Sequence, residues 1–370
     1  MKILILNWQD IKHPLGGGAE VHLHEIFRRI VEAGHEVTLF CSTFKGAKAH
    51  ERLDGIEIIR KGGRNTFNFW VPLKYWTTFR GQHFDVVVDD VNKIPFFTPL
   101  YVKEPLVSIF HHFFGRTVFL ETHFFAALYV YLSEKLVRFT YRKTPAIVGS
   151  SKSTFRELLD LGFHEENITM APGCVDHDRY RPSGIPKSKT QLIGCLGRLK
   201  KYKSIDHLIR AFAIIKPQFP LAKVLIVGDG DHRSGLEQLT SELTLGSSVT
   251  FTGFVSEEEK VKLLQEMHFV VNTSSKEGWG LTVIEANACG TCVIASNVPG
   301  LRDSVVDRET GLLYEYGNIE QLAEKMSLLL RSEDLRKRLS EEALKWSENF
   351  RWEDSAMKTL EALQRVAERK

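Results

Sequence analysis

The sequence has few cysteines, little net charge and no long apolar run, and each shortage narrows the class of protein. Five cysteines, an odd number scattered over 370 residues, indicate free thiols in a reducing compartment. A net charge of +3 does not by itself indicate a nucleic-acid-binding surface. No segment approaches the roughly 20 apolar residues that a membrane-spanning helix needs. We therefore expect a cytoplasmic protein with no nucleic-acid partner.

The N-terminal segment does not have the pattern of a signal peptide. Its apolar run in MKILILNWQD covers four residues and ends in polar groups, so we expect a first strand there. The composition, 43% hydrophobic and 26% charged, is that of a soluble globular protein. A chain of 370 residues is too long for one ordinary core, and two domains are expected.

Short apolar runs alternate with helical patterns along most of the chain. Strands are predicted at 3–6, 36–41, 85–89, 106–110, 146–149, 191–196, 223–227, 249–251, 269–272 and 292–295. Helices are predicted at 20–33, 124–141, 205–216, 234–243, 257–267, 281–288, 318–330, 335–346 and 352–369. This alternation predicts an α/β fold with two parallel, doubly wound sheets.

A segment rich in Pro, Gly, Ser and Lys over 180–190 separates the two repeats. It predicts an N-terminal Rossmann-like domain over 1–180 and a second domain over 187–348. After about residue 318 the pattern is all-helical. We expect the last helix, about 350–370, to pack back on the N-terminal domain.

The aromatic residues are unevenly distributed. Eighteen of the 24 Phe precede residue 173, many of them within 110–131, and Arg138, Arg142 and Lys143 follow. One interpretation is an aromatic-rich core. The other is a surface that contacts lipid or a lipid-linked substrate, with the basic residues meeting anionic headgroups. The sequence leaves both open.

The most informative stretch runs from Glu277 to Glu285, EGWGLTVIE. It follows an apolar run expected to be a buried strand, so Glu277 should lie in a strand-to-helix loop and Glu285 inside the next helix. Such a loop presents backbone N–H groups and a helix N-terminus at a sheet edge, where α/β proteins bind phosphates. Acidic side chains beside an anion site suit sugar and ribose hydroxyls.

The spacing of these two acids argues against paired acid–base catalysis. Eight helical residues would span roughly 12 Å, which exceeds the roughly 5–9.5 Å between glycosidase carboxyl groups. Glu277 and Glu285 are therefore expected to hold separate parts of one extended ligand.

Two further loops have the composition of anion sites. The run from Pro14 to Glu20 follows the first expected strand with three adjacent glycines, which permit close backbone approach to a ligand. Its spacing does not fit the Gly-x-Gly-x-x-Gly of dinucleotide sites. The run Gly197 to Ser204 carries four basic side chains after a strand. Arginine and lysine at such a position suit a diphosphate.

Taken together, these motifs resemble a retaining glycosyltransferase of family 4 over essentially the whole chain. The Glu-x7-Glu pair, the upstream Gly-Arg-Leu…Lys and the N-terminal glycine loop stand in that family's order and spacing. The resemblance implies the GT-B fold, in which two Rossmann-like domains face each other across a cleft. It also implies a nucleotide diphosphate sugar as co-substrate, with neither a further cofactor nor a metal.

The resemblance implies roles for the residues of the second half. Arg198, Lys203 and the helix start at Gly280, Leu281 and Thr282 would bind the donor diphosphate.

The two acids and the glycine loop would hold the rest of the donor. Glu285 would bind the ribose hydroxyls and Glu277 the hydroxyls of the donor sugar. Gly17 and Gly18 would close over the phosphate and sugar from the other domain.

The base would lie beside Gly228, Asp229 and Val255. His111 would match the family's active-site histidine, although His112 leaves the register open by one residue. The expected catalytic residues are His111, Glu277, Arg198 and Lys203.

Three features are interpreted as structural. Asp89 and Asp90 end a strand, but the resemblance implies a metal-independent site. Cys289 and Cys292 form a lone Cys-x-x-Cys, which is weak evidence for redox or zinc chemistry. Cys292 stands where the family usually has Pro, and Ser204 where it often has Gly.

The expected reaction is sugar transfer with retention of the anomeric configuration. The acceptor attacks the anomeric carbon from the same face from which the phosphate leaves. The acceptor is expected to be a glycan or a lipid-linked molecule in polysaccharide or glycolipid biosynthesis, so the enzyme could contact the inner face of the membrane. Two alternatives stay open: a nucleotide-sugar epimerase of similar fold, and a non-catalytic protein that binds sugar nucleotides.

Overall fold

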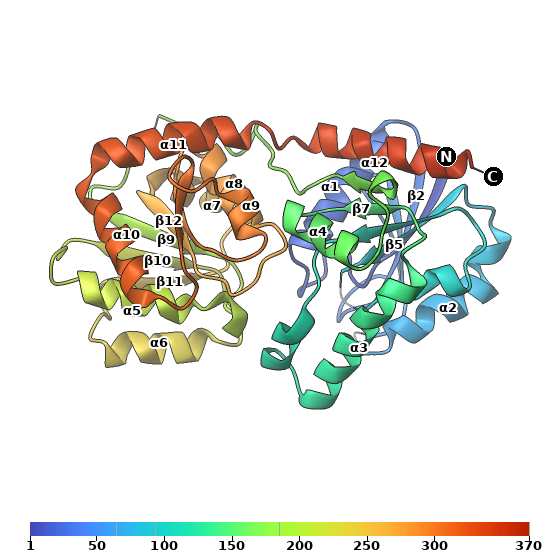
Figure 1. Cartoon of the computed structure of the whole chain (residues 1–370), viewed down its shortest axis with the longest axis horizontal. Coiled ribbons are helices and arrows are strands. Elements are labelled where there is room, and N and C mark those ends of the chain that lie inside the picture. Colours follow the sequence, from blue (N-terminus) through green and yellow to red (C-terminus); the bar gives the residue numbers. More distant parts are fainter. Residues whose placement is uncertain (64, 93, 185, 370) are drawn as a thin grey trace. The chain divides into compact units, whose positions relative to one another are not determined.

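The computed structural model of the chain describes residues 1–63, 65–92, 94–184 and 186–369. The chain divides into two compact units (Figure 1). The first contains Met1–Cys174 and the C-terminal Trp352–Lys370, and the second contains Val175–Arg351.

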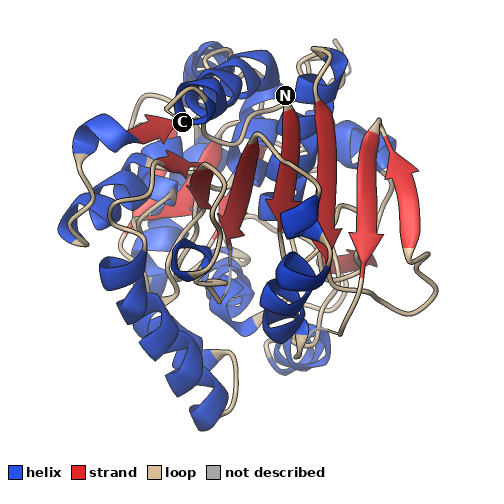
Figure 2. Ribbon diagram, turned by 90° about the vertical axis from the view of Figure 1, so that its right-hand side faces the viewer, coloured by secondary structure: helices blue, strands red, loops and turns tan. Residues whose placement is uncertain are grey.

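The first unit is built on an eight-stranded sheet with the order β3-β4-β2-β1-β5-β6-β7-β8. Figure 2 shows strands of this sheet side by side, with helices beside them. Its strands are β1 (Lys2–Leu6), β2 (Glu36–Cys41), β3 (His50–Leu53), β4 (Ile56–Arg60), β5 (Val86–Val91), β6 (Leu106–Phe110), β7 (Ala146–Val148) and β8 (Ile168–Met170). All pairings are parallel except the β3–β4 hairpin.

Helices connect these strands as the crossovers of a doubly wound sheet require. They are α1 (Gly18–Glu32), α2 (Phe67–Thr77), α3 (Phe124–Thr140) and α4 (Lys152–Asp160), with short 3₁₀ turns between them. The C-terminal helix α12 (Trp352–Ala367) also belongs to this unit but connects no strands. Every side chain of β5 is buried. Such a run, covered on both faces, is the pattern of a central parallel strand.

The last helix, α12, returns to the first unit and packs against α1. The His22 and Trp352 rings lie 6.1 Å apart, and Arg29 donates to Glu353 at 2.8 Å. This confirms the sequence-based expectation for the C-terminal helix. The packing follows from the amphipathic pattern of both helices: α1 and α12 each bury one face, and that of α12 includes Ala356.

Sequence reasoning missed several elements of the first unit. The hairpin β3–β4 turns at Asp54 and Gly55, both with positive φ, and its first strand, HERL, is polar. Helix α2 contains Pro72 and is apolar on most sides, so neither the helical period nor the usual absence of proline marks it.

The second unit is built on a six-stranded parallel sheet with the order β11-β10-β9-β12-β13-β14. Its strands are β9 (Leu192–Leu196), β10 (Lys223–Val227), β11 (Val249–Gly253), β12 (Phe269–Asn272), β13 (Val293–Ser296) and β14 (Gly311–Tyr314). Its helices are α5 (Ile205–Ile215), α6 (Arg233–Glu242), α7 (Glu257–Glu266), α8 (Leu281–Ala288), α9 (Leu301–Ser304), α10 (Ile319–Arg331) and α11 (Glu333–Ser347).

One continuous apolar core joins this sheet to α5 and α10. It includes Ile193 and Ile226 from the strands, Phe212 from α5 and Met326 from α10, all fully buried. Within the part of the chain that the structure describes, no helix is both long enough and apolar enough to cross a bilayer.

The aromatic side chains of the first unit are divided between buried and exposed positions, so the aromatic-core interpretation holds for the buried set, and lipid contact by the exposed set stays a prediction. Phe67, Phe79 and Phe96 lie in one apolar core of the first unit, and Phe110 and Phe113 in another. A second set on α2 and α3 is exposed; it consists of Phe69, Trp76, Phe124, Phe125, Tyr129 and Phe139.

Candidate functional site

The site residues of the second unit gather where its sheet reverses strand order. Strand β9 pairs with β10 on one side and β12 on the other, so the loops after β9 and β12 leave the sheet at a topological switch point. Open α/β sheets bind ligands outside the carboxyl ends of their strands at such points. The sequence-predicted Arg198 and Lys203 lie on the first of these loops, and Glu277 on the second.

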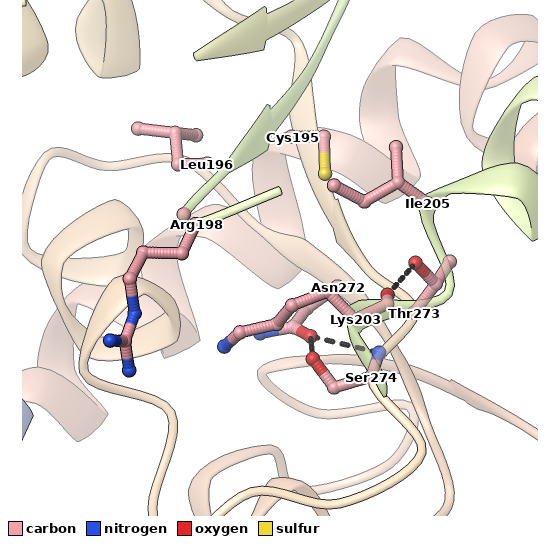
Figure 3. A pocket seen from close by; sticks show the side chains of 9 residues that line it. Cys195, Leu196, Arg198, Lys203, Ile205, Asn272, Thr273 and Ser274 are labelled. Carbon is pink, nitrogen blue, oxygen red and sulfur yellow. Dashed lines mark hydrogen bonds between the residues drawn. The ribbon is translucent and has the colours of Figure 1, made fainter. Parts of the chain in front are cut away.

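A small, open pocket lies at this switch point (Figure 3); it has about 210 Å³ of free space, which includes open solvent. It is lined by Cys195, Leu196, Gly197, Arg198, Lys203, Ile205, Asn272, Thr273 and Ser274. Its polar lining therefore comes from the ends of the two adjacent strands and the loops that follow them. Figure 3 shows the Arg198 side chain extending away from the cluster around Lys203 and Asn272.

The β9–α5 loop is held by its backbone as well as its side chains. Ser204 adopts a left-handed conformation, with φ of 48°, immediately before α5. Glycine favours this region, so the serine at this position is accommodated at some conformational cost. The backbone at Lys203 is held by Thr273, whose Oγ1 donates to the Lys203 carbonyl oxygen at 2.8 Å.

Lys203 and Glu277 form an ion pair across the switch point. Their side chains are 19% and 15% exposed, and Ser274 Oγ also donates to Glu277 Oε1 at 2.8 Å. Burial alone would lower the pKa of Lys203, but the charge of Glu277 outweighs it and the pKa lies above its ordinary value. A fixed cation and a fixed carboxylate thus lie side by side at the carboxyl edge of the second sheet.

Glycines bring the β12–α8 loop close to its neighbours. Gly280 caps α8 with φ of 90°, and a Cβ there would lie 2.8 Å from Leu301 Cδ2. A Cβ on Gly300 would lie 2.2 Å from the Glu277 carbonyl oxygen. Helix α8 begins at Leu281, so Leu281 and Thr282 stand in its first turn, whose N–H groups have no partner within a helix.

Glu285 lies inside α8, as the sequence predicts, and its carboxylate is tied to α7. Lys260 Nζ donates to Glu285 Oε1 at 2.8 Å and lies 3.6 Å from Glu257 Oε1. Tyr180 in turn donates to Glu257. The second oxygen of Glu285 is buried with no hydrogen-bond partner among the described residues. A buried polar atom without a partner calls for an explanation, and a bound ligand hydroxyl would supply one.

Gly228 and Asp229 follow β10, beside the β9 loop. A Cβ on Gly228 would stand 2.1 Å from the Gly197 carbonyl oxygen, so only glycine fits. Asp229 is partly exposed; its carboxylate accepts from Arg233 at 3.1 Å and from the Gly230 amide at 2.7 Å. Val255 follows β11 and is also partly exposed.

The glycine loop of the first unit leads into α1 at the carboxyl end of β1. Gly17 caps the helix, and Gly18 is its first residue. The Gly17 amide donates to Glu20 Oε2 at 2.7 Å, and Asn92 donates to the other oxygen of Glu20 at 3.1 Å. β1 pairs with both β2 and β5, so this loop also leaves the sheet where strand order reverses.

His111 follows β6 and is buried beneath that edge. Its Nε2 lies 2.8 Å from Asp90 Oδ1, and its ring centroid lies 5.0 Å from that of His22. Burial opposes the protonated ring, but the Asp90 carboxylate outweighs it and raises the pKa of His111. Burial and the neighbouring His111 lower the pKa of His22 to about 3. His112 is only half-buried, and its ring packs on Phe114 at 4.8 Å.

Sequence reasoning missed Lys260, Ser274 and the Asp90–His111 contact. Lys260 belongs to a charged run in α7 that resembles a solvated face. The sequence does carry a signal for the Asp90–His111 contact. Two aspartates end one predicted strand and a histidine ends the next, and neighbouring parallel strands bring such ends together. Cys289 and Cys292 are buried free thiols, and burial raises the pKa of Cys289 to about 12.

The two halves of the chain match two family models. Residues 176–346 match the model described as Glycosyl transferases group 1, and residues 16–179 match that of Glycosyltransferase Family 4.

Curated relatives are also glycosyltransferases. An uncharacterized glycosyltransferase of Methanocaldococcus jannaschii, MJ1069, is 23% identical over 99% of both chains. The D-inositol 3-phosphate glycosyltransferase of Nocardia farcinica is 31% identical over 58% of this chain and 51% of that protein. The matched region therefore spans about half the length of that relative.

Solved structures resemble the whole chain. Sucrose-phosphate synthase from Thermosynechococcus elongatus has a TM-score of 0.83 at 21% identity, with 100% of both chains covered. HepE of Anabaena, solved with UDP and glucose, has a TM-score of 0.78 at 19% identity, covering 98% of this chain and 99% of that one. At these identities the likeness shows the fold.

Proposed function

The chain belongs to the group 1 glycosyltransferases of family 4, with the GT-B fold, and we propose that it transfers a sugar from a nucleotide diphosphate sugar with retention of anomeric configuration. The acceptor is a glycan or a lipid-linked molecule. The observation that carries this proposal is the Lys203–Glu277 ion pair at the switch point. It places a cation for phosphate beside a carboxylate for sugar hydroxyls.

In this proposal the donor lies along the carboxyl edge of the second sheet. Lys203, Arg198 and the first-turn amides of α8 bind the diphosphate, as basic groups and helix N-termini do in other α/β proteins. Glu285 accepts from the ribose hydroxyls through its unpaired buried oxygen. Gly228 keeps the backbone close enough for the base to lie between Asp229 and Val255.

The chemical task is to stabilise the negative charge that develops on the departing diphosphate. Lys203 is fixed by Glu277, and fixed charges stabilise a transition state without reorganising. Glu277 also accepts from the donor sugar and orients its anomeric carbon. The acceptor then attacks from the face that the phosphate leaves. In the first unit, the proposal assigns the contact with the sugar to His111 or His112.

The first experiment identifies the donor. A thermal-shift screen over UDP-, GDP- and ADP-sugars should show one nucleotide class that raises the melting temperature, because a ligand at 100 times its Kd stabilises by about 2.7 kcal/mol. UDP-glucose is the first candidate, since HepE of Anabaena has been solved with it. The donor found in this way is then incubated with an acceptor panel, and the anomeric configuration of the product is read by NMR.

Variants of the ion pair then test the site. Lys203→Ala and Glu277→Ala should each lower transfer at least about a hundredfold. Lys201→Ala, an exposed residue of the same loop, is the matched control and should keep full activity. Inverted product, or near-normal transfer by either site variant, contradicts the proposal. An isomeric nucleotide sugar formed from donor alone identifies an epimerase instead, and binding without turnover identifies a non-catalytic protein.

A further inference from the structure

Helix α3 carries a stripe of large apolar side chains along its exposed face. The stripe consists of Phe125, Tyr129, Leu132, Leu136 and Phe139, at alternating intervals of four and three residues. This spacing keeps all five on one side of a helix. Phe125 is 83% exposed and Phe139 is 71% exposed. The opposite face packs on the unit through residues such as Ala127 and Val137.

Helix α2 extends the same apolar surface. Phe69, Leu73 and Trp76 are exposed on one side of it, while Phe67 and Tyr75 are buried on the other. Asn68 Nδ2 donates to Tyr129 Oη at 2.9 Å, which joins α2 to α3. Figure 1 shows α3 projecting from the sheet of its unit. We call these eight exposed side chains of α2 and α3 the aromatic ridge.

The exposed charged side chains of α3 and of the turn that follows it are all basic, whereas Glu121, just before the helix, is an exposed acid. From residue 124 to 143, which the structure describes in full, the exposed charged side chains are Lys135, Arg138, Arg142 and Lys143. None of the four forms an ion pair with a described residue. The one acid of this segment, Glu134, is buried and accepts from the amides of Phe114 and Gly115 at 2.6 and 2.8 Å.

A basic group also lies beside the exposed face of α2. The Arg80 guanidinium lies 4.6 Å from the centroid of the Trp76 ring, so a cation and an indole share the edge of the ridge. The whole protein carries a net charge of only +3. The basic groups around the ridge are therefore a local concentration.

From this arrangement we propose that the aromatic ridge docks the first unit on an anionic lipid surface. Aromatic and leucine side chains on one helical face, flanked by lysine and arginine, are what an interfacial helix presents to a bilayer. The 17 residues of α3 span about 25 Å, enough to lie along a headgroup layer. A second copy of the chain fits less well, because facing ridges would bring like charges together.

The ridge is tested by vesicle flotation of the full chain. We compare vesicles of phosphatidylcholine alone with vesicles that also contain phosphatidylglycerol, at low and high ionic strength. The intact protein should float with the anionic vesicles, less at high salt because screening weakens the attraction. Phe125→Ser/Leu132→Ser/Phe139→Ser should lower the bound fraction at least about tenfold. Because these side chains are exposed, the fold should be unchanged.

Two control proteins separate the ridge from general effects. Leu221→Ser/Leu328→Ser/Met357→Ser removes exposed apolar side chains elsewhere and should bind as the wild type does. The charge-reversal variant Lys135→Glu/Arg138→Glu should lose the preference for anionic vesicles. Its control, Lys189→Glu/Lys223→Glu, reverses the same number of charges at exposed positions of the second unit and should retain more of this preference.

Three results would overturn the proposal. They are no flotation of the wild type at low salt, equal flotation of the ridge variant, or a wild-type dimer in sedimentation that the ridge variant abolishes. The last result would identify a second copy as the occupant. None of these measurements uses sugar transfer, so they succeed or fail independently of the proposed function.

Discussion

Lys260 on α7 donates to one carboxylate oxygen of Glu285 on α8 at 2.8 Å, while the other oxygen of Glu285 has no partner among the described residues. Burial alone would lower the pKa of Lys260, but the charges of Glu285 and Glu257 raise it above its ordinary value. The lysine therefore stays charged and fixes one oxygen of Glu285. It acts as a positioning residue for the carboxylate that we assign to the ribose.

Lys260→Met should weaken donor binding more than it slows turnover. Without its cation, the carboxylate of Glu285 can rotate, and a contact made equally in ground and transition states affects KM rather than kcat. We expect the donor KM to rise about tenfold, or about 1.4 kcal/mol. Steady-state kinetics with varied donor measures this.

Lys262→Met is the matched control, because Lys262 lies on the same helix and is exposed. It should leave both constants unchanged. An unchanged donor KM in Lys260→Met, with the fold intact by circular dichroism, would show that Lys260 does not position Glu285 for the donor.

Substitution of Gly228 should separate the two loops that form the base side of the donor site. A Cβ at this position would stand 2.1 Å from the Gly197 carbonyl oxygen, and φ is 129°. Gly228→Ala should therefore destabilise the fold by more than about 2 kcal/mol and weaken nucleotide binding at the same time. Urea unfolding and calorimetric titration of the nucleotide measure the two effects.

Gly246→Ala provides the comparison, since a Cβ at Gly246 meets nothing within 4 Å. It should change stability by less than about 0.5 kcal/mol and leave binding unchanged. If Gly228→Ala behaves in the same way, the close packing of the β9 and β10 loops does not support the site.

The regular alternation of elements made much of the second unit predictable from sequence. Helix Leu281–Ala288 and strands Lys223–Val227 and Phe269–Asn272 have the predicted bounds, because apolar runs bounded by glycine or polar turns determine them locally. This placed Glu277 in a loop and Glu285 in a helix.

The features of the site that could not be predicted from sequence are contacts between distant segments of the chain. Lys260 meets Glu285 across 25 positions of the chain, and nothing in the α7 pattern distinguishes it from neighbouring lysines. The strand Gly311–Tyr314 and the hairpin ending at Arg60 were missed. The Asp90–His111 contact required the order of the strands, which pattern alone does not give.

The two adjacent histidines should respond differently to substitution. His111 is buried against Asp90 and its pKa is raised, whereas His112 is half-buried. His111→Ala removes the ring that faces a buried carboxylate and should lower the melting temperature by several degrees. His112→Ala should leave the melting temperature unchanged, and a loss of transfer of about tenfold or more in this variant would give the sugar contact to His112. Thermal unfolding and single-turnover assays distinguish these effects; full activity in His112→Ala would assign the active-site role to His111.

The buried carboxyl of Asp89 should make stability depend on pH. Burial raises its pKa to about 7 from its ordinary value of 3.8, although Thr98 and Tyr141 donate to Oδ2 at 2.5 and 2.6 Å. Between about pH 4 and pH 7 the folded protein keeps a proton that the unfolded chain has lost. The folded state then binds more protons, so this group makes stability fall as pH rises through that window and level off above it.

Asp89→Asn removes this dependence while keeping an acceptor for Thr98 and Tyr141. The difference in unfolding free energy, wild type minus variant, should therefore fall by about 1–3 kcal/mol between pH 5 and pH 8. Groups that do not interact with Asp89 titrate alike in both proteins, and their contributions cancel. Urea unfolding at several pH values measures the difference. A difference that stays constant, or that rises with pH, would mean that Asp89 is ionised throughout and that its two hydrogen bonds outweigh its burial.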